Sequence, residues 1–205
     1  MKFLKTLLNQ FGNGINNEES LTFEEQLEVF HEIGFRLNYS VTKVDLDIWD
    51  GGLKEYEEHP YELLYITFGQ YADEKFEQPF SNNCWDFDLE ELKDVASHSF
   101  VLRAMSRISN KEIQLSNIKC VESDEHETAI IFECNGDSYQ WSLDKKRYLT
   151  DRIIFHKVKE LAKKYKTKGK YTSYATGGHD FVMGFMTPDE FKTFKQKTGL
   201  DIEWL

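Results

Sequence analysis

The sequence predicts an α+β protein in which helices flank a mainly antiparallel sheet. Two observations support this fold class: a hairpin turn at Asn135-Gly136, and helices and strands that mix without regular βαβ alternation. With 205 residues, 40% of them apolar, the chain can build a substantial core. We expect two closely packed lobes forming one compact unit, an acidic α+β lobe over 1–110 and an α+β lobe over 111–205. The boundary is placed near Ser109–Glu112.

The hairpin is the clearest local feature. A two-residue type I′ turn needs positive φ at both central positions, which Asn-Gly provides. The alternation of side chains then puts the large apolar residues on one face, which fixes the register. The predicted cross-strand pairs are Cys134 with Asp137, Phe132 with Tyr139, and Ile130 with Trp141.

Two helices carry complete start and stop signals. In the first, Thr22 and Glu25 form a capping box and Gly34 ends the helix. The second has the same signals at Thr187, Pro188, Glu190 and Gly199. The shared pattern fits either two independently well-capped helices or a distant duplication.

The other elements of the first half follow from periodicity. Alternating apolar and acidic residues predict a half-buried strand over Val44–Ile48, and a more apolar strand is predicted over Tyr61–Phe68. A helix is predicted to open at Asp88 and to continue to Ile108. Met1–Phe11 has helical spacing, which indicates an amphipathic helix docked on the core or, alternatively, on a membrane or partner.

The second half alternates strands and helices. A helix is predicted over Asp151–Tyr165, followed by two strands, Lys170–Thr176 and Asp180–Met186. The last residues, Leu200–Leu205, have a strand pattern.

Charge is divided sharply along the chain. The net charge is −11, with fifteen acidic residues over Asp45–Asp94 and eleven basic ones over Lys145–Lys170. The acidic excess disfavours nucleic acid and favours a basic protein partner. The basic stretch is either the solvent face of an amphipathic helix, a contact to the acidic lobe, or a phosphate-binding face.

The cysteines indicate the compartment. Cys84, Cys120 and Cys134 are odd in number and lack zinc-site spacing, so we expect three thiols in a reducing, cytoplasmic environment. No apolar run is long enough to span a bilayer. We predict no membrane association and no cofactor.

Candidate binding residues lie in an aromatic, polar loop over Pro79–Asp88. Within it Cys84, Trp85 and Asp86 either pin the loop to the core or contribute to a site. Cys84 would need a neighbouring histidine to act as a nucleophile, and the sequence places none beside it.

Two glycine turns supply the other candidates. Gly177, Gly178, His179 and Asp180 form either a tight polar turn, a binding edge or, least favoured, a catalytic site. In a strand His179 and Asp180 would point to opposite faces, so they do not form a simple couple. Trp49 and Asp50 start a turn whose spacing departs from a calcium loop. We predict no catalytic residue and no metal ligand.

Five segments together carry a family resemblance: Thr22–Gly34, Phe80–Asp88, Tyr139–Leu143, Gly177–Asp180 and Thr198–Leu205. In this order they resemble a family of uncharacterised bacterial cytosolic proteins over nearly the whole chain. In character, such small acidic proteins are similar to the immunity proteins of bacterial polymorphic toxins. The resemblance implies a protein partner and transfers no site residue.

The sequence therefore favours a non-catalytic protein-binding module, immunity-like in type, with an acidic face for a basic partner. The alternative is an enzyme or small-ligand-binding protein that uses an inter-lobe cleft near Trp85 and Gly177–Asp180. A third hypothesis is a mainly structural subunit.

Overall fold

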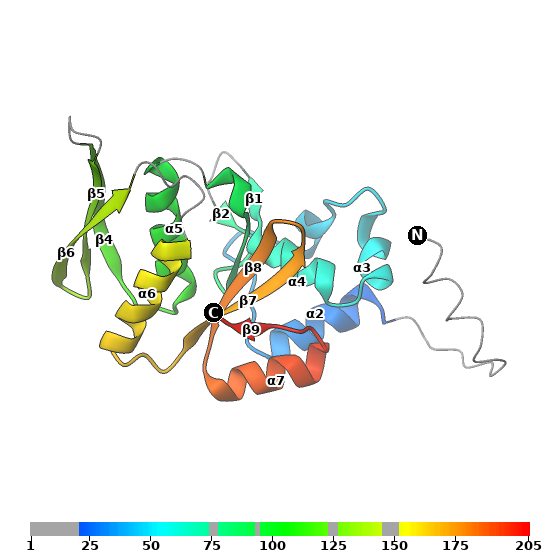
Figure 1. The fold of residues 1–205 in the computed structure, drawn as a ribbon. Coiled ribbons are helices and arrows are strands. Elements are labelled where there is room, and N and C mark those ends of the chain that lie inside the picture. Colours follow the sequence, from blue (N-terminus) through cyan, green and yellow to red (C-terminus); the bar gives the residue numbers. More distant parts are fainter. Residues whose placement is uncertain (1–20, 74–77, 93–94, 123–126, 145–151) are drawn as a thin grey trace, which may run out of the picture.

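The computed structural model of the chain describes residues 21–73, 78–92, 95–122, 127–144 and 152–205. It confirms the α+β class, and the sheets are antiparallel in every described strand pair. Of the two larger sheets, which have three and four strands, the first lies at one end of the molecule in Figure 1, and the second lies between it and several helices at the other end.

The four-stranded sheet joins strands from distant parts of the chain in the order β3-β8-β7-β9. Its strands are β3 (Cys84–Asp88), β7 (Lys170–Gly177), β8 (Asp180–Met186) and β9 (Glu203–Trp204). The three-stranded sheet contains β4 (Leu115–Glu122), β5 (Glu127–Cys134) and β6 (Asp137–Asp144). A small pair joins β1 (Tyr71–Asp73) to β2 (Gln78–Pro79).

The helices pack around these sheets. Within the described ranges, the α-helices are α2 (Phe23–Glu32), α3 (Glu55–Glu58), α4 (Glu62–Gly69), α5 (Val95–Ile108), α6 (Arg152–Lys164) and α7 (Pro188–Thr198). Three short 3₁₀ turns are η1 (Lys43–Leu46), η2 (Gly52–Lys54) and η3 (Leu89–Glu91).

The local predictions for the hairpin and for the capped helices are confirmed. β5 and β6 pair in the predicted register through Asn135 (φ 49°) and Gly136 (φ 92°). Thr22 and Thr187 both form complete capping boxes. The helix over Asp151–Tyr165 is found as α6, and the two predicted strands after it are found as β7 and β8.

Two predicted strands of the first half are wrong. Val44–Ile48 lies largely in η1, where the Asp45 carboxylate accepts hydrogen bonds from the backbone N–H and the hydroxyl of Thr42. Only Leu46 of the predicted apolar face is buried, and Val44 is 79% exposed. Tyr61–Phe68 is found mainly in helix α4, because a continuous apolar run fits a buried helix as well as a buried strand.

The segment around Asp88 also differs from the prediction. The predicted loop over Pro79–Asp88 contains strand β3, and Asp88 pairs with Asp180 of β8 rather than opening a long helix. Its side chain caps only the short η3, which ends at Glu91, whereas the later part of the predicted helix is found as α5 over Val95–Ile108. The predicted final strand is confined to Glu203–Trp204, and the predicted helix over Met1–Phe11 lies outside the described residues.

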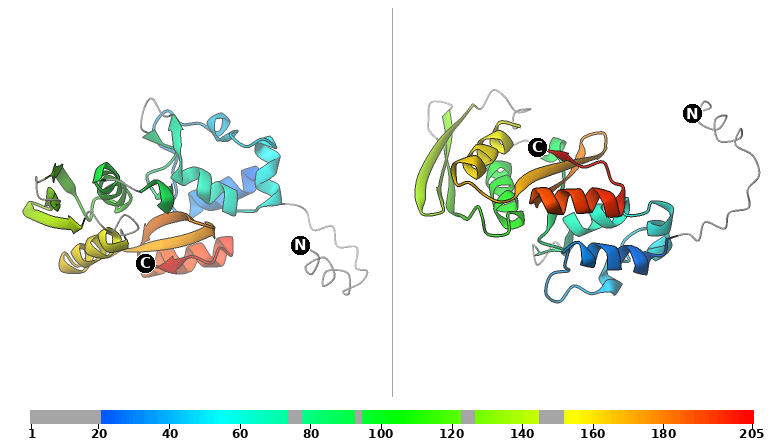
Figure 2. Two further views of the ribbon diagram at one scale, coloured as in Figure 1. Left: turned by 45° about the horizontal axis from the view of Figure 1, so that its top comes forward. Right: turned by 90° about the horizontal axis from the view of Figure 1, so that it is seen from below.

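The four-stranded sheet separates two apolar cores. Neighbouring residues of one strand point to opposite faces, so Cys84 and Val182 face the first core while Trp85 and Met183 face the second. Helices α2, α4 and α7 enclose the first core, and α5 and α6 cover the second, as Figure 2 shows from two further sides. Each core therefore takes residues from both halves of the chain.

Candidate functional site

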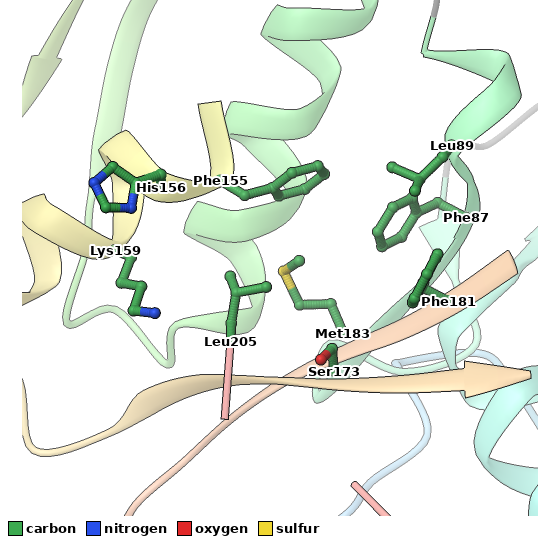
Figure 3. A pocket seen from close by; sticks show the side chains of 9 residues that line it. All are labelled: Phe87, Leu89, Phe155, His156, Lys159, Ser173, Phe181, Met183 and Leu205. Carbon is green, nitrogen blue, oxygen red and sulfur yellow. The ribbon is translucent and has the colours of Figure 1, made fainter. Parts of the chain in front are cut away.

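A cavity of about 400 Å³ lies between α6 and the face of the four-stranded sheet that carries the second core (Figure 3). Its volume falls within the range of small-molecule sites, roughly 300–1,000 Å³. Its lining residues are Phe87, Leu89, Phe155, His156, Lys159, Ser173, Phe181, Met183 and Leu205.

Strand pairing builds the sheet side of this cavity. Phe87 of β3 pairs with Phe181 of β8, and Met183 of β8 pairs with Ser173 of β7. Because directly paired residues project from the same face of a sheet, these four side chains form one surface. The segment after β9 closes one side of the cavity, since the Leu205 backbone N–H donates to the Tyr171 carbonyl oxygen at 3.0 Å.

An aromatic stack forms the apolar end. The Phe87 ring lies 5.5 Å from the ring of Phe155 and 6.2 Å from that of Phe181, with interplanar angles of 27° in both pairs. On its buried side Phe87 stacks on Trp85 at 4.1 Å. The rings are thus held in orientation by neighbours, which limits the reordering that a bound molecule would require.

The polar groups are few and come mainly from α6. His156 and Lys159 are three residues apart on the helix and therefore share one side of it. Figure 3 shows them together at one end of the cavity, opposite Phe87 and Phe181. The site therefore has an apolar end and a cationic end.

None of the nine candidate residues from the sequence lines this cavity, although two groups of them lie beside it. Trp85 is fully buried and supports Phe87 from behind. Cys84 is also fully buried, on the opposite face, where burial raises the pKa of its thiol well above the usual value. A buried neutral thiol is a poor nucleophile, so the structure supports a packing role for Cys84.

Asp86 lies on the face opposite Trp85 and is mostly shielded from solvent. Burial raises the pKa of its carboxyl to about 6, while a hydrogen bond from Gln70 Nε2 to Asp86 Oδ2 at 3.2 Å lowers it in part. The nearby charges of Asp180 and Glu91 raise it further. Asp86 is therefore a carboxylic acid of raised pKa on strand β3, outside the cavity.

The turn Gly177–Asp180 joins β7 to β8 at the edge of the same sheet. Gly177 (φ 119°) and Gly178 (φ 63°) adopt backbone conformations that favour glycine. The His179 side chain is exposed and its Nε2 lies 3.3 Å from Glu90 Oε1. The His179 carbonyl oxygen accepts a hydrogen bond from the backbone N–H of Leu89. The turn therefore anchors the β3–η3 connection next to the cavity.

Trp49 and Asp50 lie on the other side of the sheet. The Trp49 Nε1–H donates to Thr67 Oγ1 at 3.0 Å, and the ring packs on the first core. Asp50 is exposed in the turn that leads to η2. Among the described residues no group of three or more His, Cys, Asp or Glu side chains could hold a metal ion.

Sequence patterns did not identify the cavity residues as a site, although the alternation of apolar residues that places some of them on one face was present. Trp85, Phe87 and Leu89 alternate as one face of a strand would, and so do Phe181 and Met183. What local patterns do not contain is the pairing of β3 with β8 and the packing of α6 over them.

One segment of the chain has several exposed apolar side chains. Tyr39 is 95%, Val44 79% and Ile48 46% exposed. Exposed acidic residues lie in the same segment of chain, namely Asp45, Asp47 and Asp50. We call residues 39–50 the acidic–apolar segment. Within the described ranges, no helix has the length and apolar character needed to cross a membrane.

Comparisons with known proteins find no family model, no curated protein sequence and no solved structure that matches the chain.

Proposed function

We propose that the protein binds a small, largely apolar molecule in the cavity between α6 and the four-stranded sheet. One observation carries the proposal: aromatic rings from three separate elements line one end of an open cavity of about 400 Å³ beside the second core. A bound apolar molecule would remove this aromatic surface from water, with a gain of about 25 cal/mol per Å².

A fluorescent dye without charge tests this proposal. Nile red brightens in apolar surroundings, so its titration reports occupation of the cavity. The variant Ser173→Phe adds a ring at the half-buried sheet side of the cavity, in a strand that tolerates aromatic residues. We expect it to weaken dye binding by roughly tenfold, equivalent to about 1.4 kcal/mol.

The matched control is Ser138→Phe, the same change on the exposed side of β6. Dye affinity should stay at the wild-type value in this variant. Equal dye binding by the wild type and by Ser173→Phe would place the dye elsewhere and count decisively against the proposal.

A second function is favoured by the acidic–apolar segment. We propose that this segment binds a basic protein partner, in the manner of a toxin-immunity protein and without catalysis. Isolated exposed apolar residues are ordinary, but large ones clustered in sequence among carboxylates suit a protein contact. Tyr39 and Val44 would supply buried contact area, and the aspartates would steer a basic partner.

Affinity capture from host lysate, with and without a substitution, tests the second proposal. Val44→Asp should abolish capture of a salt-sensitive partner, because it places a charge in the apolar part of the contact. The control Ile131→Asp changes an exposed isoleucine on the distant three-stranded sheet and should leave capture intact. If the amount of captured partner changes neither in Val44→Asp nor with the salt concentration, this proposal is contradicted.

A further inference from the structure

We infer that the molecule bound in the cavity is a carboxylic acid with an apolar body, and that its carboxylate lies at Lys159. This inference rests on the proposed small-molecule function and adds the chemical class and the orientation of the ligand.

The first argument is the separation of polarity along the cavity. Figure 3 shows Lys159 and His156 at one end, Phe87 and Phe181 at the other, with Phe155 between them. A molecule that fills the cavity with its apolar part at the ring stack brings its other end to α6. That end therefore meets an ammonium group and an imidazole, which favour an acceptor or an anion.

The second argument is that Lys159 is available. The neighbouring lysines of α6 are engaged, since Lys163 pairs with Glu160 at 2.7 Å and Lys164 with Asp137 at 3.1 Å. Lys159 is half-buried and takes part in none of the ion pairs formed among the described residues. An anion bound in the cavity beside this ammonium group would be flanked by aromatic walls, and such apolar surroundings weaken solvent screening of the pair.

The residues that line the cavity suit a carboxylate better than a phosphate. Phosphate sites typically combine arginine forks or several cations with backbone N–H groups, whereas this lining contains one lysine and one histidine. The net charge of −11 also repels a dianion more than a monoanion. A single negative charge therefore fits the single ammonium group.

The fourth argument concerns the apolar body. Phe87, Phe155 and Phe181 offer ring faces and edges, and Met183 lies among them as an adaptable thioether. An alkyl chain or a flat ring could both pack here, so the common feature of the ligand is an apolar body with one acid group.

The experiment compares two ligands that differ only in the headgroup. Decanoate and 1-decanol are each titrated against the Nile red complex of the wild-type protein and of two variants. Lys159→Met removes the ammonium but keeps an unbranched apolar stem. Lys163→Met removes an equal charge one helical turn away, outside the cavity lining.

We expect Lys159→Met to lower the affinity for decanoate by about five- to tenfold, which is the range for a partly exposed charge-assisted contact. The affinities of 1-decanol and Nile red should change less than about twofold, and Lys163→Met should leave all three unchanged. Added salt should reduce the affinity for decanoate but not that for 1-decanol.

The outcomes separate the inference from the proposed function. If Nile red binds in the cavity but Lys159→Met changes decanoate and 1-decanol equally, the carboxylate assignment is overturned and the apolar site stands. If Ser173→Phe binds Nile red as tightly as the wild type does, the proposed function itself is overturned.

Discussion

The rings of Trp85 and Phe87 stack with their centroids 4.1 Å apart, although only Trp85 is fully buried. The two residues are two positions apart on β3 and therefore project from the same face of the sheet. Trp85 belongs to the second core, whereas Phe87 lines the cavity. The core thus holds the cavity wall in place through this pair.

This relationship predicts that two tryptophans with the same kind of ring contact contribute very differently to the free energy of unfolding. Trp85→Leu should lower the free energy of unfolding by about 2–4 kcal/mol, because it leaves a cavity in the second core. Trp204 also stacks on a phenylalanine at 4.1 Å, but it is 38% exposed. Trp204→Leu should cost less than about 1 kcal/mol. Urea unfolding of both variants measures the difference, and equal losses would contradict the burial argument.

A close backbone approach predicts that Gly69 cannot be replaced. An added Cβ at Gly69 would lie 2.4 Å from the backbone nitrogen of Asp86, where α4 packs directly on β3. Gly69→Ala should therefore cost about 1–3 kcal/mol or more in unfolding free energy. Gly51→Ala is the control, because its Cβ would meet only the movable side chain of Glu55. Chemical denaturation should rank Gly69→Ala far below Gly51→Ala in stability.

The raised pKa of Asp86 predicts a pH-dependent stability. The pKa of the Asp86 carboxyl is about 6 in the folded protein, against roughly 4 in an unfolded chain. Between these two pH values Asp86 keeps its proton in the folded protein but loses it in the unfolded chain. Protonation of Asp86 therefore contributes fully to stability below about pH 4, and this contribution is lost as the pH rises through 6. Asp86→Asn removes the dependence and can keep the acceptor for Gln70.

We therefore expect Asp86→Asn to be more stable than the wild type at pH 8, by at most roughly 3 kcal/mol for a shift of about two units. The difference should vanish below pH 4. Urea unfolding at several pH values gives the comparison, and Asp50→Asn at an exposed turn serves as the control. A stabilisation that is independent of pH would point to packing instead of ionisation.

The three thiols should differ sharply in reactivity. Cys84 and Cys134 are fully buried, and burial raises the pKa of both thiols, whereas Cys120 is only half-buried. Alkylation by iodoacetamide under native conditions should modify Cys120 first, since the reagent needs an accessible thiolate. Peptide mapping by mass spectrometry identifies the labelled residue. Early labelling of Cys84 would contradict the packing of β3.

Local chemistry made the second half of the chain predictable. The Asn135-Gly136 turn and the Thr187 capping box act within a few residues, and both are found as the sequence indicates. The apolar run Tyr61–Phe68 was misassigned because burial on all sides removes the periodicity that separates helix from strand. Val44 was misassigned because an exposed apolar residue mimics an alternating pattern.

The cavity was beyond sequence reasoning for a different reason. Phe87, Phe155 and Phe181 come from β3, α6 and β8, and only tertiary packing brings their rings together. Trp85 and the Gly177–Asp180 turn, which the sequence singled out as candidates, lie beside the cavity. The immunity-like character and the boundary between 1–110 and 111–205 stay predictions.

The interleaving of early and late segments in the first core has a consequence for biosynthesis. Phe30 packs edge-on against Phe194 at 5.9 Å, and Val182 and Ile202 complete the same core. A nascent chain therefore leaves the aromatic surface around Phe30 uncovered until Phe194 and Ile202 have been translated. Contacts of such wide sequence separation also slow folding. Translation of α7 and β9 is thus the step that allows α2 to complete its native packing.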